Sequence, residues 1–248
     1  MNRLISLELH KLRTTPAAGV AVVITVLLGA LSVATNTLGP ITPGGPAFGS
    51  TDHVNHALSV SALTSMVMLS IGVIMVASEY RTRTIVSTFL ATPQRARVLV
   101  AKLATSLGLG AVLGAAAFGL AWVEATLMYA SRGVHTLPVD LTQLWVGATV
   151  STALFGLLGV ALGALTRNTV TAIVGGIAWA MVIEIGILSS VAPEIGKWLP
   201  AGNALALTSV GSAGSQLLSP WVSAAVLTGW AIGLAAIATR LTLSREAH

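Results

Sequence analysis

The sequence LWVGATVSTALFGLLGVALGAL at residues 144–165 is an uninterrupted apolar run without a charged side chain. About 20 such residues are what an α-helix needs to cross the hydrocarbon core of a bilayer. Five further runs have similar length. We expect all six to be helices, because lipid offers backbone groups no hydrogen-bond partner. The predicted spans are residues 17–37, 57–78, 103–130, 144–165, 170–192 and 221–243.

The composition is that of a membrane protein. Hydrophobic residues make up 54% of the 248 residues and charged residues only 8%, whereas a soluble domain has about 25% charged residues. The absence of cysteine excludes disulfides and thiol chemistry. The basic residues are not gathered with aromatic ones, so we expect no nucleic-acid partner. We predict a single all-α transmembrane domain over residues 1–248.

The positions of lysine and arginine indicate the orientation, because both are enriched in cytoplasmic loops. With six spans and both termini in the cytoplasm, only Arg132 and Lys197 of the 13 basic residues fall outside. A cleaved signal peptide is the alternative for the first span. It is disfavoured by the length of the run and by the lack of a small-x-small cleavage site. The cytoplasmic residues are Arg3, Lys11, Arg13, Arg81, Arg83, Arg95, Arg97, Lys102, Arg167, Arg240 and Arg245.

Residues 3–13 have the pattern of an amphipathic helix. Five aliphatic side chains share one broad face, and Glu8 and Lys11 lie at its margin, where they can pair. This pattern suits a helix lying in the membrane interface. The simpler alternative is a basic topology signal with no further role.

The cytoplasmic segment 79–102 contains a second apolar stripe at helical spacing, formed by Ile85, Val86, Phe89 and Leu90. Thr92–Pro93 then predicts the start of a new helix that continues into the third span. The stripe with its flanking arginines suits either a docking surface for a cytosolic partner or a helix resting on the bilayer. The spacing alone does not favour one of these.

The outer segment 193–220 is too apolar for an ordinary loop, and structureless loops of this length are uncommon. We expect it either to dip back into the membrane or to pack over its outer mouth. The alternative is a loop resting on the outer surface.

Two carboxylates lie inside predicted spans. Glu184 falls beyond the midplane of the fifth span and is expected to face the bundle interior or a partner, because a charge in lipid is costly. Glu124 lies near the outer end of the third span, where reaching the interface is the simpler explanation. Either carboxylate could serve a proton relay.

No motif for catalysis, cofactor binding or metal binding is found. The only Gly-Lys pair, Gly196–Lys197, lacks the other residues of a phosphate-binding loop. His53 and His56 share a loop with Asp52, but the spacing favours at most weak metal binding. We therefore expect no catalytic, cofactor or metal site, and ATP could be used only through a partner.

The chain resembles the permeases of ABC type-2 transporters, the six-span membrane subunits of bacterial exporters. The similar stretches are residues 79–84 (EYRTRT), 90–95 (LATPQR) and 101–103 (AKL). Arg83 stands where these permeases usually have glycine before Thr84. Glu8, Lys11 and Leu12 also resemble their opening stretch.

This resemblance implies a multi-pass protein of the bacterial cytoplasmic membrane. It implies that two permease copies, or a copy and a paralogue, recruit two cytosolic ATPase subunits and export a small-molecule or lipid-like substrate. Residues 3–13 would form an interfacial connecting helix. The expected ATPase-coupling residues are Glu79, Arg81, Arg83, Thr84, Ile85, Val86, Phe89, Leu90, Arg95 and Arg167. The expected residues of the translocation path or gate are Glu184, Glu124, Trp198, Leu199 and Pro200.

Two other functions remain open. One is a proton-coupled secondary transporter, although no internal repeat or matched pair of broken helices is found. The other is a membrane scaffold or assembly factor without transport. Association with a cytosolic ATPase distinguishes both from an ABC permease.

Reporter fusions test the predicted topology. Fusions at Asn55, Arg83, Gly133, Asn168 and Gly202 are expected to report outside, inside, outside, inside and outside, because this order places nearly all basic loops in the cytoplasm. A cytoplasmic signal at Gly202 would contradict the six-span arrangement.

Overall fold

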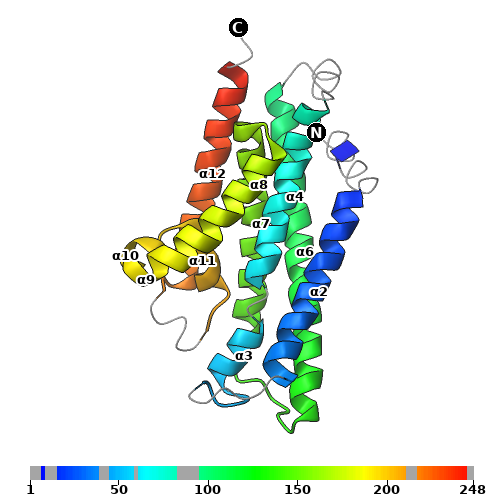
Figure 1. The fold of residues 1–248 in the computed structure, drawn as a ribbon, viewed down its shortest axis with the longest axis vertical. Helices are drawn as coiled ribbons and strands as arrows, with labels where there is room; N and C mark the ends of the chain where they lie inside the picture. The colour runs from blue at the N-terminus through cyan, green and yellow to red at the C-terminus, as the bar shows by residue number, and fades with distance from the viewer. Residues whose placement is uncertain are drawn as a thin grey trace.

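The computed structural model describes residues 7–8, 16–38, 45–58, 61–82, 95–210 and 217–244. Within these residues the chain is helical and contains no strand. The long helices lie side by side in one elongated bundle (Figure 1). The predicted all-α membrane fold is confirmed at this level.

Five helices are long and apolar enough to cross a membrane. Four of these spans correspond to α4 (Ser61–Arg81), α6 (Arg95–Ser131), α7 (Leu141–Thr166) and α12 (Pro220–Ser244). The fifth is a continuous rod made of α8 (Thr169–Ala178), η1 (Trp179–Leu188) and α9 (Ser189–Val191). Helix α2 (Pro16–Leu38) contributes the shorter apolar stretch Val22–Leu38. These helices fall on the six predicted runs, although six membrane crossings stay a prediction.

Three short helices complete the described fold: α3 (Thr51–Leu58), α10 (Pro193–Gly196) and α11 (Pro200–Leu207). Helix α3 lies at the lower end of the bundle in Figure 1, whereas α10 and α11 lie part-way up its side. The ends of α4, α7 and α12 and the start of α6 lie at the upper end. The described chain therefore stops at residue 82 and resumes at residue 95 at the upper end of the bundle.

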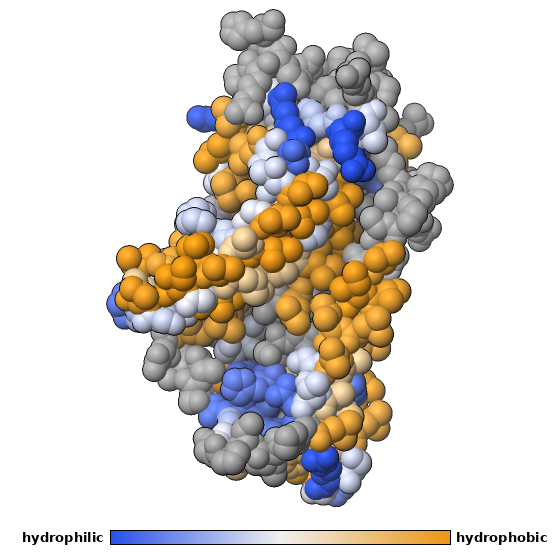
Figure 2. Space-filling model, in the orientation of Figure 1, coloured by the Kyte–Doolittle hydropathy of each residue, from blue (hydrophilic) through white to orange (hydrophobic). Residues whose placement is uncertain are grey.

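The surface has the distribution expected for a protein surrounded by lipid. Hydrophobic side chains cover the flank formed by α2 and that formed by α8 and η1, and hydrophilic ones gather toward the two ends (Figure 2). Helix α6 has 37 residues, which is about 55 Å of helix, compared with about 30 Å of hydrocarbon. The helix is therefore longer than a membrane crossing requires.

Helices α4 and α7 approach so closely that their backbones touch. A Cβ atom added to Gly159 of α7 would overlap the carbonyl oxygen of Leu69 on α4. One added to Gly72 of α4 would likewise overlap the carbonyl oxygen of Gly156 on α7. Small residues permit this kind of packing in membranes, where dispersion contacts rather than water exclusion hold helices together. Helix α7 also packs against α6, α8, α11 and α12, so it forms the centre of the bundle.

The turn between α7 and α8 is short and well defined. Arg167 adopts the left-handed conformation that commonly ends a helix, with φ of 53°. The Asn168 side chain then accepts a hydrogen bond from the Thr171 amide and caps α8. The Arg167 guanidinium lies 4.9 Å from the ring centroid of Tyr80, so this turn contacts the end of α4.

At the lower end, α3 joins several segments. His53 Nδ1 lies 2.6 Å from the hydroxyl of Tyr129 on α6, and the Asn55 side chain accepts a hydrogen bond from the Val210 amide. His53 thus takes part in a structural contact. No group of three or more potential metal ligands occurs among the described residues.

The α4–α7 contact can be tested with matched glycine substitutions. Gly159→Ala forces a methyl group into the Leu69 carbonyl, and overpacking of this kind costs about 3 kcal/mol. We expect less monodisperse protein by size-exclusion chromatography and a lower melting temperature in detergent. Gly108→Ala in α6 is the control, because its Cβ would meet no atom within 4 Å. Equal behaviour of the two variants would contradict the close packing.

Candidate functional site

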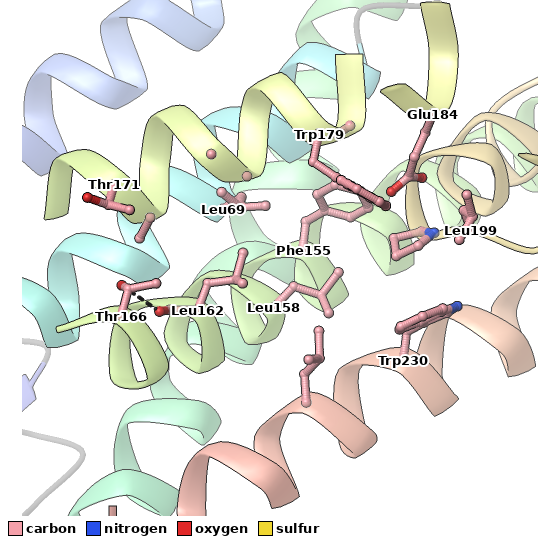
Figure 3. A pocket seen from close by; sticks show the side chains of 16 residues that line it. Leu69, Phe155, Leu158, Leu162, Thr166, Thr171, Trp179, Glu184, Leu199 and Trp230 are labelled. Carbon is pink, nitrogen blue, oxygen red and sulfur yellow. Dashed lines mark hydrogen bonds between the residues drawn. The ribbon is translucent and has the colours of Figure 1, made fainter. Parts of the chain in front are cut away.

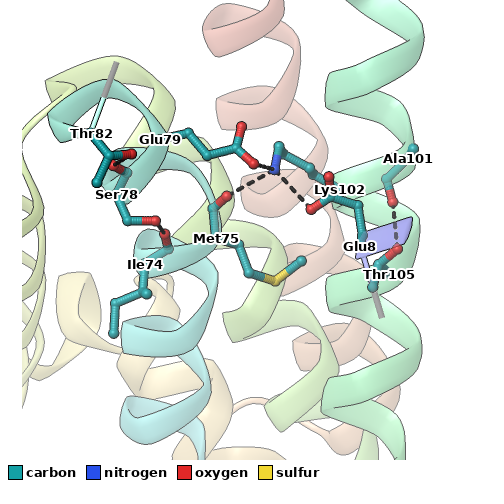
Figure 4. Close-up of polar contacts among 9 residues, drawn as sticks. All are labelled: Glu8, Ile74, Met75, Ser78, Glu79, Thr82, Ala101, Lys102 and Thr105. Carbon is teal, nitrogen blue, oxygen red and sulfur yellow. Dashed lines mark hydrogen bonds and ion pairs between the residues drawn. The ribbon is translucent and has the colours of Figure 1, made fainter. Parts of the chain in front are cut away.

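A buried lysine lies near the upper end of the bundle. The Lys102 ammonium on α6 is within 2.8 Å of Glu8 Oε2 and 2.9 Å of Glu79 Oε1, and it donates to the Met75 carbonyl oxygen at 2.9 Å (Figure 4). Lys102 is 1% exposed, and both carboxylates are also buried. We call Glu8, Glu79 and Lys102 the ion cluster.

The ion cluster connects three segments that are distant in sequence. Glu8 comes from the N-terminal segment, Glu79 from the last turns of α4, and Lys102 from the second turn of α6. A buried ammonium is tolerated only when its charge and its donors are matched, and here three oxygen atoms surround its three donors. Separating the three segments would expose an unmatched charge, so the ion cluster favours their movement as one unit.

The sequence analysis did not predict the pairing of these three residues. Lys102 was assigned to the basic cytoplasmic set, and Glu8 was placed where it could pair with Lys11. The structure places Glu8 on Lys102. Lys11 lies outside the described residues, so a Glu8–Lys11 pair stays a prediction, as does the amphipathic helix at 3–13, of which only Leu7 and Glu8 are described.

The predicted coupling residues are only partly described. Glu79 belongs to the ion cluster, Arg81 is exposed at the end of α4, and Arg167 lies over Tyr80. The structure therefore brings these three residues to the upper end of the bundle. Arg95 begins α6, but its side chain is not described. The remaining predicted coupling residues lie outside the described part of the chain: Arg83, Thr84, Ile85, Val86, Phe89 and Leu90.

A groove of about 390 Å³ lies among α7, α8, η1 and α12. Its walls are almost entirely apolar, with Phe155 and Leu158 of α7 facing Trp230 of α12 (Figure 3). Thr166 and Thr171 lie toward one end, and Glu184 lies at the other. We call this space the Glu184 groove.

Glu184 belongs to a helical stretch with wide turns. In η1 the hydrogen bonding follows the π pattern, and the amide of Ser189 donates to the carbonyl oxygen of Glu184, five residues earlier. Such stretches are rare and often occur at functional positions. The Glu184 side chain is 3% exposed, so its predicted position inside the bundle is confirmed.

The Glu184 carboxylate caps the start of α11. Its Oε2 accepts a hydrogen bond from the Ala201 amide at 2.6 Å. Pro200 has no amide hydrogen, and the N-cap residue Leu199 supplies no side-chain acceptor. The first amide of α11 would otherwise be unsatisfied. A negative charge at a helix N-terminus is also favourable, so Glu184 holds α11 against η1.

Of the other predicted gate residues, Leu199 and Pro200 line the Glu184 groove. Trp198 is fixed beside it, because its carbonyl oxygen accepts a hydrogen bond from the Trp230 indole at 3.0 Å. Glu124 does not line the groove; it is half-buried on α6. The sequence analysis did not single out Trp179 and Trp230, and aromatic residues within apolar runs were the only signal for them.

A second groove, of about 330 Å³, lies between the lower parts of α7 and α12. Gly147 and Val150 line it from α7, and Trp221 and Ala224 line it from α12. The last residue of α11, Leu207, lines this second groove, whereas its first residue, Pro200, lines the Glu184 groove. Helix α11 therefore lies between two cavities along the same pair of long helices.

Comparison with models of known protein families and with curated proteins gave no match for this chain.

Substitution of Lys102 tests the ion cluster. Lys102→Met leaves two carboxylates without their shared cation, and breaking a buried pair in this way costs about 3–5 kcal/mol. We expect a clearly lower melting temperature in detergent. Combining Lys102→Met with Glu8→Gln and Glu79→Gln also removes the two carboxylate charges and is expected to recover part of the loss.

Lys197→Met is the matched control. Lys197 pairs with Glu194 at the protein surface, where ion pairs contribute little, and its melting temperature should stay close to that of the parent. A similar loss in both variants would indicate that burial of Lys102 is unimportant.

Proposed function

We propose that this chain is the membrane-spanning permease subunit of an ATP-driven exporter. The ion cluster is the observation that carries the proposal. It fastens the N-terminal segment, α4 and α6 together at the end of the bundle where the described chain stops at residue 82 and resumes at residue 95. A partner that moved residues 83–94 would therefore move three anchored segments together. The resemblance of residues 79–103 to ABC type-2 permeases supports the same assignment.

A separate cytosolic ATPase supplies the energy in this proposal, because the sequence has no phosphate-binding loop. The apolar stripe at residues 85–90 is the proposed docking surface, with Arg81 and Arg83 at its rim. Two permease chains pair and recruit two ATPase chains. The upper end of the bundle in Figure 1 then faces the cytoplasm of a bacterial cell, with six spans and both termini inside.

The bundle offers a mechanical connection from the proposed docking end to the Glu184 groove. Helix α4 carries Glu79 at one end and touches the backbone of α7 through Gly72 and Gly159 further along. Helix α7 in turn supplies Phe155 and Leu158 to the groove wall. Tightly packed helices shift between discrete arrangements rather than deform continuously, so a displacement of α4 would reach the groove.

Helices α10 and α11 are the proposed re-entrant gate. Helix α11 packs against η1, α7 and α12, and it lies between the two grooves. Withdrawal of α11 would join these cavities into a path along α7 and α12. Nucleotide binding to the ATPase must favour one of the two gate positions for transport to be coupled.

A proton-coupled transporter is the second candidate, favoured by the buried carboxylate of Glu184. In that case transport would depend on the proton gradient and would continue without an associated ATPase. Collapse of the gradient by an uncoupler would then abolish transport.

Co-purification tests the proposed function. The tagged chain, purified from its native membrane in mild detergent, is expected to retain a subunit with a phosphate-binding loop and ATPase activity, in equal copy number. Phe89→Ala removes the aromatic residue of the stripe. Loss of such an anchor costs at least about 2 kcal/mol, so retention should weaken by roughly 30-fold.

Leu127→Ala is the control, because Leu127 is an exposed apolar residue on α6 far in sequence from the stripe. It should retain the ATPase as the parent does. Absence of any ATPase from the parent preparation, or equal retention by Phe89→Ala and Leu127→Ala, would contradict the proposal.

A further inference from the structure

The charge of the residues that line the Glu184 groove favours cations over anions. Glu184 is its one ionisable lining residue, and none of the described lining residues is basic. An anionic ligand would meet the Glu184 carboxylate without a compensating positive side chain. A cation would meet an opposite charge in a weakly polarisable environment, where charge attraction is stronger than in water.

The Glu184 carboxylate is only partly used by the protein. Its Oε2 caps α11, and the Trp179 indole and the Gly202 amide also donate toward the carboxylate, but the buried Oε1 makes no hydrogen bond of good geometry with the described residues. The Trp179 ring lies beside the carboxylate, and the Trp230 ring lies across the groove (Figure 3). Indole faces attract cations, so the rings and the carboxylate favour the same kind of ligand.

The rest of the groove suits an apolar body. Leucine, alanine and glycine residues with Phe155 form most of the wall, and a volume of about 390 Å³ falls within the range of small-molecule sites. The Glu184 groove is apolar along most of its length and has one acidic side chain at one end. It is therefore complementary to a ligand with a hydrophobic body and one positive charge.

We infer that the Glu184 groove binds small cationic amphiphiles. Glu184 is the counter-ion of the bound cation, and the aromatic and aliphatic side chains of the wall contact the hydrophobic part of the ligand. This inference rests on the proposed function and names the substrate class of that exporter. Bound cation would also compete with the Ala201 amide for the carboxylate, which links occupancy of the groove to the cap of α11.

Two ions of the same shape and opposite charge test the inference: tetraphenylphosphonium and tetraphenylborate. Equilibrium dialysis measures their binding to the purified chain in uncharged detergent, with protein-free micelles as the blank. Tetraphenylphosphonium is expected to bind saturably at one site per chain, and tetraphenylborate is not. Glu184→Gln should weaken cation binding at least about tenfold, because the counter-ion is lost.

Glutamine keeps an acceptor for the Ala201 amide, so Glu184→Gln removes the charge with little change in shape. Glu124→Gln is the matched control. It neutralises a carboxylate on α6 that does not line the groove, and it should leave cation binding unchanged. The size-exclusion profile checks that each variant is folded, and the comparison of the two ions on the parent protein needs no variant.

Equal binding of both ions, or unchanged cation binding by Glu184→Gln, would overturn the inference. A third result would also overturn the inference. If the protein retains phosphatidylethanolamine in a Glu184-dependent manner but does not bind tetraphenylphosphonium saturably, the groove is a site for a bilayer lipid. These measurements need no ATPase. If the cation does not bind but an ATPase co-purifies, only the proposed substrate class is rejected. If the cation binds but no ATPase co-purifies, only the assignment as an ATP-driven exporter is rejected.

Discussion

The contact between the backbones of α4 and α7 is the constraint on which the rest of the bundle depends. Helices in lipid gain little from hiding apolar side chains from one another, so close approach and shape matching must hold them together. Glycines on both helices permit this approach. Because α7 also contacts α6, α8, α11 and α12, its position relative to α4 determines where the groove walls lie. The ion cluster then fixes the end of α4 to α6 and to the N-terminal segment.

Much of the fold could be predicted from hydropathy alone. The predicted run at residues 144–165 corresponds to α7 (Leu141–Thr166), and that at 221–243 corresponds to α12 (Pro220–Ser244). The agreement has a simple cause, since the transfer of a helix into lipid depends on its length and composition, and both are local properties of the sequence. Predictions of this kind need no knowledge of which helices are neighbours.

Contacts between distant segments could not be predicted in this way. The glycine pairs Gly110/Gly114, Gly159/Gly163 and Gly229/Gly233 have the same spacing in the sequence, and this spacing permits close helix packing at each of them. The first two pairs lie against neighbouring helices, whereas a Cβ on Gly229 or Gly233 would meet no atom within 4 Å. Likewise, nothing local to Lys102 identifies Glu8 as its partner 94 positions away. Burial of Glu184 followed from the cost of charge in lipid, but its role as the cap of α11 depends on how the chain returns after η1.

The π-helical stretch has a consequence for how this chain tolerates insertions and deletions. Each residue of an α-helix turns the following chain by about 100°, and the wider turns of η1 accommodate extra residues within the same length of helix. Removing one residue between Trp179 and Leu188 would restore ordinary spacing and rotate Glu184 relative to Ala201 or to α8. Val182 and Ile187 are exposed on the outer face of this stretch. Replacing them with other aliphatic residues would change neither the spacing of the turns nor the orientation of Glu184. Related chains should therefore vary freely in which aliphatic residues occupy this stretch, while the number of residues between the Asn168 cap and Pro200 stays constant.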